Sequence, residues 1–447
     1  MQLIGSSYTL ILGLGIAGMS CARHLLAQGA SVAIADTRES VDGLDALLAD
    51  YPDVPRRFAD LLTPEWVAQA SEIVLAPGLG LDDPLVAEAV KAQVPIIGEL
   101  DLLRRAAPDQ KIVAITGTNG KSTVTTLVGD MLAAAGCSVA VGGNLGRPML
   151  DLLADQAEYL VLELSSFQLE RAQTFSPSVA TVLNMSPDHL DRHGNMVGYY
   201  QAKHRIFNGA DACVINQDDA LSRPLIGENL KVVEFTTGPS DFHRFGIDVI
   251  DDERVVALKF QKVIALSEIP LVGQHNIANA MAAIALVHAL DISLDAALDG
   301  LRGYESLPHR MRKCGEIDGV IYVNDSKGTN EGASVAALQG MLASVSGQVW
   351  MLVGGDGKGS DFERLAAAAQ DPRARLIGYG RDGQKIIQRC QGEQVVKTLD
   401  QALALAQQFA AEGDAIVLSP ACASFDQFAS FTARGEYFES LVQEHSV

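Results

Sequence analysis

The sequence of 447 residues predicts an α/β protein of three domains. Short β-rich runs alternate with Ala- and Leu-rich helical stretches, and many of these runs are apolar on both faces. Many also lead into Gly, Asn, Asp or Ser, as in parallel sheets that bind ligands at the carboxyl ends of their strands. The expected strands are Tyr8–Leu12, Ser31–Ala35, Glu72–Ala76, Ile112–Thr116, Ser138–Val141, Tyr159–Glu163, Val179–Asn184, Val320–Asn324, Val349–Val353, Leu376–Tyr379 and Ala415–Ser419.

Two bridging segments divide these strands into three blocks. The first bridge is "PIIGELDLLRRAAPDQ" and the second is "GYESLPHRMRKCGEIDG". We therefore expect domains at residues 1–98, 99–306 and 307–447. Between about Ala220 and Leu271 the runs become short and alternating, which predicts a small antiparallel element within the second domain.

The composition limits the classes of partner. The chain has 34 Lys and Arg against 55 Asp and Glu, a net charge of −21 that repels nucleic acid and anionic membranes. The N-terminal "MQLIGSSYTLILG" lacks the basic region of a signal peptide, and no apolar run reaches membrane-spanning length. Six scattered cysteines indicate a reduced intracellular protein without a zinc site. We expect a cytoplasmic protein with no nucleic-acid partner and no membrane insertion, in which any anionic substrate needs a local basic site.

The turn "GTNGKS" (Gly117–Ser122) predicts a phosphate site. It departs from the usual GxxxxGK[ST] pattern, because Ile115 stands where the first glycine belongs. It still follows a strand and opens a helix, so backbone N–H groups and the helix N-terminus can surround phosphate oxygens. Lys121 would reach the β- and γ-phosphates of ATP, and the Ser122 hydroxyl would ligate Mg²⁺. The alternative is an ordinary strand-to-helix turn.

A second glycine turn, "GLGIAG", follows the first expected strand. It carries Gly13, Gly15 and Gly18, and Asp36 ends the next strand near the spacing of a dinucleotide site. Taken alone, this pattern predicts NAD. Alternatively, the glycines only permit close packing of helix on strand. The glycine turn and Asp36 together indicate a nucleotide, but they do not indicate which nucleotide.

Nine further stretches carry a resemblance over the whole chain. They are "GGNLG", "LELSSFQLE", "NMSPDHLDRHG", "YYQAKHRIF", "GQHNIANAMAA", "LPHRM", "NDSKGTN", "GGDGKGSDF" and "SPACASFDQF". The chain resembles the Mur ligases, the ATP-dependent amino-acid-adding enzymes of peptidoglycan synthesis. The resemblance implies a Rossmann-like UDP-binding domain, a P-loop ATPase domain and a Rossmann-like C-terminal domain. "DSKGTN" is close to the pattern of the member that adds D-glutamate, which implies UDP-N-acetylmuramoyl-L-alanine and D-glutamate as substrates.

The chemistry of such a ligase explains why cations are needed. A carboxylate does not acylate an amine at neutral pH, so the γ-phosphoryl group of ATP must first convert it into an acyl phosphate. Two anions must therefore be brought together. The resemblance implies two Mg²⁺ ions, with metal positions at Ser122, Glu163, His189 and a carbamylated Lys203. The implied catalytic residues are Lys121, His189, Lys203 and Lys327.

The remaining residues implied by the resemblance fall into three sets. The ATP positions are Gly117, Thr118, Asn119, Gly120, Lys121, Ser122, Thr123, Asn276, Asn279, Arg310 and Asp325. The UDP-substrate positions are Gly15, Ile16, Ala17, Asp36, Thr37, Arg38, Gly78, Asn144, Gln168 and Arg192. The D-glutamate positions are Thr329, Lys358, Ser424, Phe425 and Phe431, with Lys327 beside them. Ile16, Ala17 and Phe425 depart from the residues that the family commonly carries.

Read without the family, several of these residues have ordinary alternatives. His189 is a packed or exposed histidine, Lys203 a solvated helix lysine, Lys358 a solvated loop lysine and Asn276 a helix N-cap. Three rival functions stay open: a folylpolyglutamate synthase-like ligase, an NAD-dependent oxidoreductase and a non-catalytic nucleotide switch. We expect a monomer whose domains close around the substrates.

Overall fold

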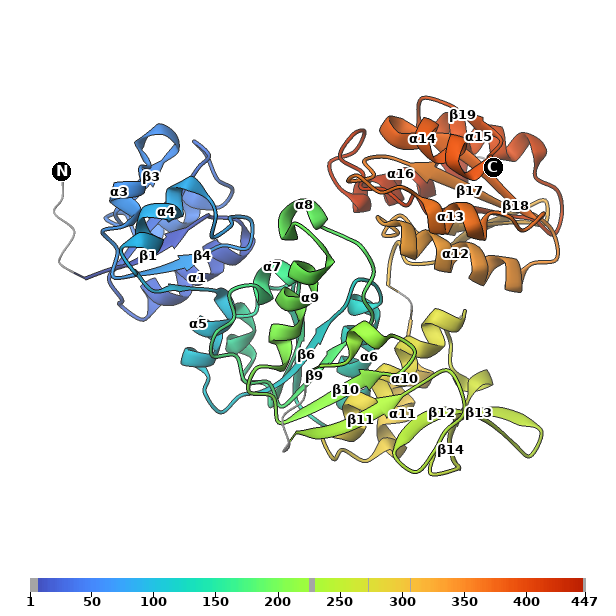
Figure 1. Ribbon diagram of the computed structural model, residues 1–447, viewed down its shortest axis with the longest axis horizontal. Helices are drawn as coiled ribbons and strands as arrows, with labels where there is room; N and C mark the ends of the chain where they lie inside the picture. The colour runs from blue at the N-terminus through green and yellow to red at the C-terminus, as the bar shows by residue number, and fades with distance from the viewer. Residues whose placement is uncertain (1–6, 225–229, 272, 306, 445–447) are drawn as a thin grey trace. The chain divides into compact units, whose positions relative to one another are not determined.

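The computed structural model describes residues 7–224, 230–271, 273–305 and 307–444, and its strands form three separate sheets (Figure 1). Every expected strand is present, with ends shifted by no more than two residues. The predicted three-domain α/β architecture is confirmed. The predicted boundary at Ser306 and the start of the N-terminal segment lie outside the described residues.

The chain divides into two compact units. Unit 1 comprises residues 1–185, 194–265 and 281–302, and unit 2 comprises residues 186–193, 266–280 and 303–447. Unit 1 holds the first two sheets and unit 2 holds the third. The domain boundaries near 98 and 306 stay predictions.

The first sheet is entirely parallel, in the order β3-β2-β1-β4-β5. Leu12 pairs with both Ala35 and Leu75, so the residues after β1, β2 and β4 meet at one edge. Its elements are β1 (Thr9–Leu12), α1 (Ile16–Ala27), β2 (Val32–Asp36), α2 (Leu44–Asp50), β3 (Arg56–Phe58), η1 (Ala59–Leu61), α3 (Pro64–Val67), β4 (Glu72–Leu75), α4 (Pro84–Lys91), β5 (Ile96–Ile97) and α5 (Glu99–Ala106).

The second sheet has the order β14-β13-β12-β11-β10-β9-β6-β8-β7. Its strands are β6 (Lys111–Thr116), β7 (Val139–Gly143), β8 (Tyr159–Glu163), β9 (Val179–Val182), β10 (Ala212–Asn216), β11 (Lys231–Phe235), β12 (Arg244–Ile250), β13 (Glu253–Leu258) and β14 (Gln261–Ala265). The pairs from β7 to β12 are parallel, whereas β12, β13 and β14 pair antiparallel, as predicted. Because Ile115 pairs with Glu163 and Thr116 with Val182, the ends of β6, β8 and β9 share one edge.

The helical segments of this second block connect and flank the strands. They are α6 (Lys121–Ala134), η2 (Asp151–Asp155), α7 (Ser166–Leu169), α8 (Leu190–His193), α9 (Met196–His204), η3 (Arg205–Phe207), η4 (Ala220–Ser222), η5 (Leu266–Glu268), α10 (Gln274–Ala289) and α11 (Leu294–Arg302). Across the described ranges, no helix is both long enough and apolar enough to span a bilayer.

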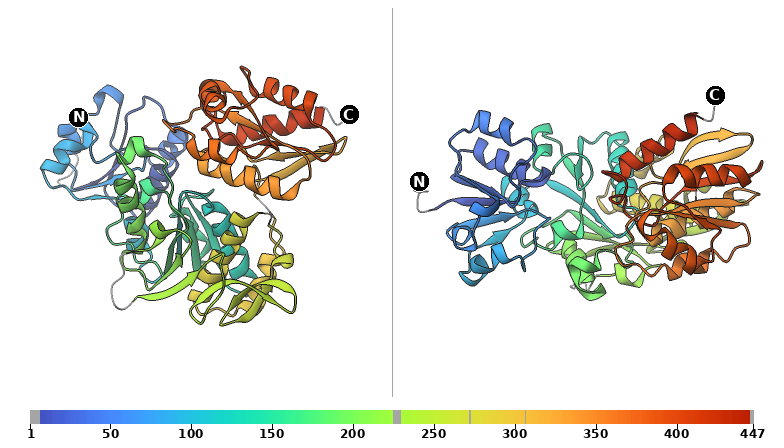
Figure 2. Two further views of the ribbon diagram at one scale, coloured as in Figure 1. Left: turned by 45° about the vertical axis from the view of Figure 1, so that its right-hand side comes forward. Right: turned by 90° about the horizontal axis from the view of Figure 1, so that it is seen from above.

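The third sheet has the order β15-β16-β20-β17-β18-β19 and is parallel except at its β15 edge. Side chains alternate along its central strand, so Met351 and Leu352 enter different apolar cores on opposite faces. Helices cover both faces, drawn orange to red in Figure 2. The elements are β15 (Arg312–Ile317), β16 (Val320–Asn324), α12 (Glu331–Ser344), β17 (Val349–Gly354), α13 (Glu363–Ala368), β18 (Ala374–Tyr379), α14 (Gly380–Cys390), β19 (Gln394–Val395), α15 (Leu399–Phe409), β20 (Ala415–Leu418) and α16 (Phe431–Glu444).

Candidate active site

The phosphate-loop sequence forms a tight turn between β6 and α6. Gly117 and Gly120 adopt φ of +155° and +83°, where a side chain would be strained. Asn184, just after β9, fixes the turn: its Oδ1 accepts from Asn119 N at 2.9 Å, and its Nδ2 donates to Asn119 O at 3.0 Å. This role of Asn184 was not predicted, although the residue ends an expected strand, as Glu163 does.

Lys121, the first residue of α6, lies back over the turn. Its Nζ donates to the carbonyl oxygens of Gly117 at 2.9 Å and Thr118 at 2.7 Å. The ammonium group is thus held over the loop that is predicted to bind phosphate, which fits a role in neutralising phosphate charge.

Glu163 lies at the end of β8 beside the same turn. The Ser122 hydroxyl donates to Glu163 Oε2, and Asn144 Nδ2 donates to Oε1 at 2.8 Å. The Glu163 side chain is buried, with an exposed fraction of 3% for the residue. Hydroxyl and carboxylate oxygens are the hard donors that Mg²⁺ prefers, so Ser122 and Glu163 fit the predicted metal.

Lys203 on α9 is buried, with an exposed fraction of 2%. The alternative of a solvated helix lysine is therefore wrong. Its Nζ donates to Thr116 Oγ1 at 3.1 Å and to Gly117 O at 2.8 Å, and lies 4.9 Å from the ring centroid of Tyr199. The amine thus lies directly under the phosphate loop.

The predicted UDP positions of the first sheet meet at its carboxyl edge. Asp36 is almost fully buried and accepts from Leu14 N at 2.6 Å and from the Arg38 guanidinium at 2.9 Å on both oxygens. Burial acts to raise the pKa of Asp36, but these hydrogen bonds outweigh it and lower the pKa. Ile16 in the first turn of α1 is 76% exposed, so an apolar side chain lies open at this edge.

Gln168 of α7 contacts α5, the helix that follows the first sheet. Its Oε1 accepts from Ser165 N, and its Nε2 donates to Glu99 Oε2 at 3.4 Å. Nearby, Arg171 Nη1 donates to the Ala76 carbonyl at 3.0 Å, just before the predicted Gly78. Asp101 of α5 accepts from the backbone of Thr174 at 2.7 Å. Arg171 and Asp101 were not predicted, because a buried charge has no signature in a single sequence.

In unit 2, the predicted amino-acid positions follow the ends of the third sheet's strands. The Lys327 ammonium lies 3.8 Å from the ring centroid of Phe431, and Ser424 is buried. Lys358 pairs with Asp188 at 3.4 Å, and its side chain is 29% exposed. Phe425 is 75% exposed.

The predicted ATP residues of unit 2 include two asparagines and a buried acid. Asn279 Nδ2 donates to Asn276 Oδ1 at 3.2 Å. Since α10 begins at Gln274, Asn276 lies inside the helix, and the N-cap alternative is wrong. Burial raises the pKa of Asp325 to about 7, although the Ser419 hydroxyl donates to it at 2.6 Å.

His189 and Arg192 belong to unit 2, whereas Lys203, Glu163 and the other predicted UDP positions belong to unit 1. His189 has φ of +53° and its Nε2 lies 3.6 Å from Asp188 Oδ2. The predicted second Mg²⁺ site stays a prediction. Among the described residues, no group of three or more His, Cys, Asp or Glu is arranged to hold a metal.

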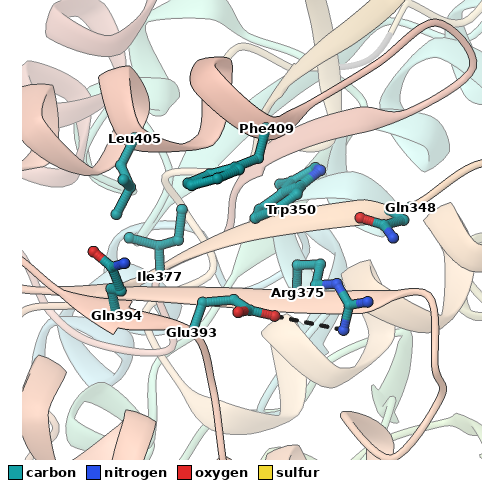
Figure 3. A pocket seen from close by; sticks show the side chains of 8 residues that line it. All are labelled: Gln348, Trp350, Arg375, Ile377, Glu393, Gln394, Leu405 and Phe409. Atoms are coloured by element: carbon teal, nitrogen blue, oxygen red, sulfur yellow. Dashed lines mark ion pairs between the residues drawn. The ribbon is translucent and has the colours of Figure 1, made fainter.

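A separate cavity of about 370 Å³ lies on the third domain, away from the predicted residues. Figure 3 shows Trp350 and Phe409 along one side and the ion pair between Arg375 and Glu393 below them. The other lining residues are Gln348, Ile377, Gln394 and Leu405. No predicted site residue lines this cavity.

Three family models match consecutive parts of the chain. They are the Mur ligase MurD-like N-terminal domain over residues 7–98, the Mur ligase middle domain over 115–287 and the Mur ligase glutamate ligase domain over 309–422. The chain belongs to the Mur ligase family. The prediction made from its motifs is confirmed.

Two relatives show how far the similarity of this Mur ligase extends. It is 46% identical to UDP-N-acetylmuramoylalanine–D-glutamate ligase of Pseudomonas aeruginosa, covering 99% of this chain and 100% of the relative. It is 43% identical to the enzyme of the same name from Marinobacter nauticus, covering 99% of both chains.

Solved structures share the fold of this Mur ligase at lower identity. The pseudomurein peptide ligase type C of Methanothermus fervidus matches with a TM-score of 0.62 and 18% identity, over 99% of this chain and 100% of that one. The UDP-N-acetylmuramate–alanine ligase of Thermotoga maritima matches with a TM-score of 0.61 and 19% identity, over 98% of this chain and 99% of that one.

Proposed function

We propose that this Mur ligase joins D-glutamate to UDP-N-acetylmuramoyl-L-alanine with conversion of ATP to ADP and phosphate. The observation that carries the proposal is the 46% identity of this chain to a full-length relative whose name includes both UDP-N-acetylmuramoylalanine and D-glutamate. "DSKGTN" and the lysines of the third domain add support, because a dicarboxylate substrate needs cations in a chain of net charge −21.

The reaction has two steps, and the side chains divide between them. In the first, the substrate carboxylate attacks the γ-phosphorus of ATP, ADP leaves and an acyl phosphate forms. Gly117–Ser122 would surround the phosphates, and Lys121 would neutralise the charge that spreads over them. Ser122 and Glu163 would hold a Mg²⁺ ion, which when bound draws phosphate oxygens together and offsets their repulsion. In the second step, the D-glutamate amine attacks the acyl carbon and phosphate leaves.

The finer roles belong to the same proposal. Lys358, Lys327, Thr329, Ser424 and Phe431 would receive D-glutamate, and His189 with a carbamylated Lys203 would hold a second Mg²⁺. Asn276 and Asn279 would lie near the adenine of ATP, and Arg310 and Asp325 would lie near its ribose and phosphates. We further propose that the enzyme acts as a monomer in the cytoplasm, where ATP and UDP-linked sugars are found.

The rivals differ in what they require. A folylpolyglutamate synthase-like ligase has no need of the first domain, and an NAD-dependent oxidoreductase has no need of the phosphate loop. The test is ADP release measured for a panel of amino acids with and without UDP-N-acetylmuramoyl-L-alanine. Of the amino acids in the panel, we expect D-glutamate and no other to stimulate ADP release. We expect this stimulation only when UDP-N-acetylmuramoyl-L-alanine is present. Stimulation by another amino acid, or without the UDP substrate, would reject the proposal.

A further inference from the structure

Arg434 carries a positive charge into the interior of the third domain. It lies on α16, its exposed fraction is 0%, and it is the largest side chain among the fully buried residues of the described chain. Burying an ion costs free energy unless other groups replace its hydration. A leucine or methionine could fill the same space without that cost. A buried arginine therefore indicates a role that depends on its guanidinium group.

The guanidinium group joins two loops through neutral oxygens. Its Nε donates to Ser326 Oγ at 3.0 Å and its Nη2 to Ser326 O at 2.8 Å. Nη1 and Nη2 both donate to Cys422 O at 3.1 Å. Within the described part of the chain, no carboxylate forms an ion pair with Arg434. Its guanidinium donates to two backbone carbonyls and the Ser326 hydroxyl, and the Tyr379 hydroxyl lies beside it. Ser326 follows β16, and Cys422 follows β20.

The Ser326 carbonyl belongs to a peptide group that also bonds to the segment around His309. The peptide group that begins with Ser326 C=O ends with Lys327 N–H, which donates to His309 O at 3.1 Å. The guanidinium and the His309 carbonyl therefore hold the two sides of one peptide plane. That plane sets the start of the Lys327 side chain, and His309 immediately precedes Arg310.

The Cys422 carbonyl likewise belongs to a peptide group that bonds to a second segment, the one around Asp356. The peptide after Cys422 ends with Ala423 N–H, which donates to Asp356 O at 2.8 Å, and Asp356 N donates back to Ala423 O at 2.9 Å. Lys358 N in turn donates to Asp356 Oδ1 at 3.1 Å. Ser424 is the next residue after this bridge.

We propose that Arg434 is a positioning residue that holds the amino-acid-binding loops in one arrangement. One guanidinium orients two peptide planes, and these planes fix the segments that carry Lys327, Lys358 and Ser424. A lysine cannot reproduce this, because a single ammonium lacks the planar fork that reaches both carbonyls. The inference rests on the proposed function only for the identity of the substrate.

The test compares two residues one helical turn apart on α16. Arg434→Lys keeps a positive charge but removes the fork, whereas Phe438→Leu opens space in an apolar core that includes Trp350 and Leu352. For Arg434→Lys we expect the KM for D-glutamate to rise at least about tenfold, with the KM for the UDP substrate within about twofold of wild type. For Phe438→Leu we expect a lower Tm and an unchanged KM for D-glutamate. Equal amino-acid KM values for wild type and Arg434→Lys would overturn the proposal.

A second measurement does not depend on the reaction. Hydrogen–deuterium exchange should become faster at residues 326–329 and 422–425 in Arg434→Lys, but not in Phe438→Leu. If wild type fails to use D-glutamate, the proposed function is wrong, while the exchange comparison still decides the role of Arg434. Arg434→Gln serves as the second variant should Arg434→Lys not fold. Unchanged exchange in the loops would show that Arg434 only stabilises the core and does not position them. The same conclusion would follow if both Arg434 variants failed to fold while Phe438→Leu folds.

Discussion

Asn144 donates to one oxygen of Glu163 at 2.8 Å, and Ser122 donates to the other. A single carboxylate thus joins the phosphate loop to the loop that follows β7. In the proposed reaction these two loops serve different substrates, the nucleotide and the UDP-linked acid. Glu163 is therefore placed to couple the metal to both.

The first prediction concerns this carboxylate. Glu163→Gln keeps the shape, and its amide can still accept from Asn144 and donate to the Ser122 hydroxyl, but it removes the charge that a Mg²⁺ ion needs. We expect the Mg²⁺ concentration for half-maximal ADP release to rise at least about tenfold, with the Tm within a few degrees of wild type. Glu158→Gln, whose partner is the exposed Lys111, is the matched control and should leave the Mg²⁺ dependence unchanged. An unaltered Mg²⁺ titration for Glu163→Gln would remove this residue from the metal site.

The second prediction tests the phosphate loop. Lys121→Ala removes an ammonium held over the loop and should lower turnover by some 10²–10³-fold, because this charge acts where phosphate charge develops. The loss of a charge-assisted contact alone would cost about 1.5–3 kcal/mol. Circular dichroism should show an intact fold. Lys111→Ala, at the exposed start of β6, is the control. Near wild-type ligation by Lys121→Ala would exclude the loop from catalysis.

The third prediction is that Lys203 is carbamylated in the active enzyme. An ammonium about 4 Å from a divalent cation would be repelled by roughly 4 kcal/mol per unit charge at an effective dielectric constant of 20. The neutral amine can instead add CO₂ and release a proton, and the resulting carbamate is an anion that binds the cation. Labelled bicarbonate and carbon NMR should give one carbamate signal that is absent from Lys203→Ala. No signal, together with full activity of Lys203→Ala, would contradict the prediction.

The fourth prediction is that the first domain binds UDP-N-acetylmuramoyl-L-alanine and not NAD. Both oxygens of Asp36 accept hydrogen bonds within the protein, from Arg38 and Leu14, so the acid is occupied where a ribose would need it. Calorimetry should give heat with the UDP substrate and none with NAD. Tight NAD binding would overturn this interpretation of the first domain.

The fifth prediction is a pH dependence that originates at Glu99. Its side chain is buried, and burial raises the pKa from 4.5 to about 7, with Asp151 adding to the rise and Gln168 and the Met149 backbone opposing it. The folded state then binds more protons than the unfolded state between pH 4.5 and 7, so this group lowers stability as the pH rises through that window. The full effect is about 3 kcal/mol.

Glu99→Gln should remove this dependence and unfold at higher denaturant concentration than wild type at pH 8. At pH 4 the two proteins should have nearly equal unfolding free energies. Glu88→Gln, at an exposed ion pair with Lys91, is the control and should follow the wild-type pH profile. Parallel profiles for wild type and Glu99→Gln would show that Glu99 does not titrate in this range.

The sequence predicted long apolar strands better than short or polar ones, although the buried interior strand β10 was not among the expected strands. Runs such as "YLVLE" of β8 are apolar on both faces and were located to the residue. The edge strand β15, "RKCGEI", has charged residues at three of its six positions, and none of its residues is buried. The strands β5 and β19 have two residues each and show no periodicity. Such strands are defined by their hydrogen-bonded neighbour and not by their own side chains.

The candidate site was predictable where function requires a rare local sequence. "GTNGKS" predicted the tight turn between β6 and α6, because glycine readily adopts the φ values of Gly117 and Gly120. The sequence did not predict three buried charged residues, Asp101, Arg171 and Arg434. Their buried contacts join segments far apart in the chain, and in sequence they look like any surface charge.

The turn after β1 has a consequence for how glycine patterns indicate ligands. A Cβ at Gly18 would lie 1.9 Å from the carbonyl oxygen of Gly13, and Gly13 itself has φ of +92°. Only at Gly15 is the surrounding space open, with nothing within 4 Å of such an atom. Two of the three glycines are thus required by the crossing of a helix over a strand, whatever is bound. A search for "GxGxxG" selects a shape of backbone, and a protein can keep that shape through any exchange of one nucleotide for another.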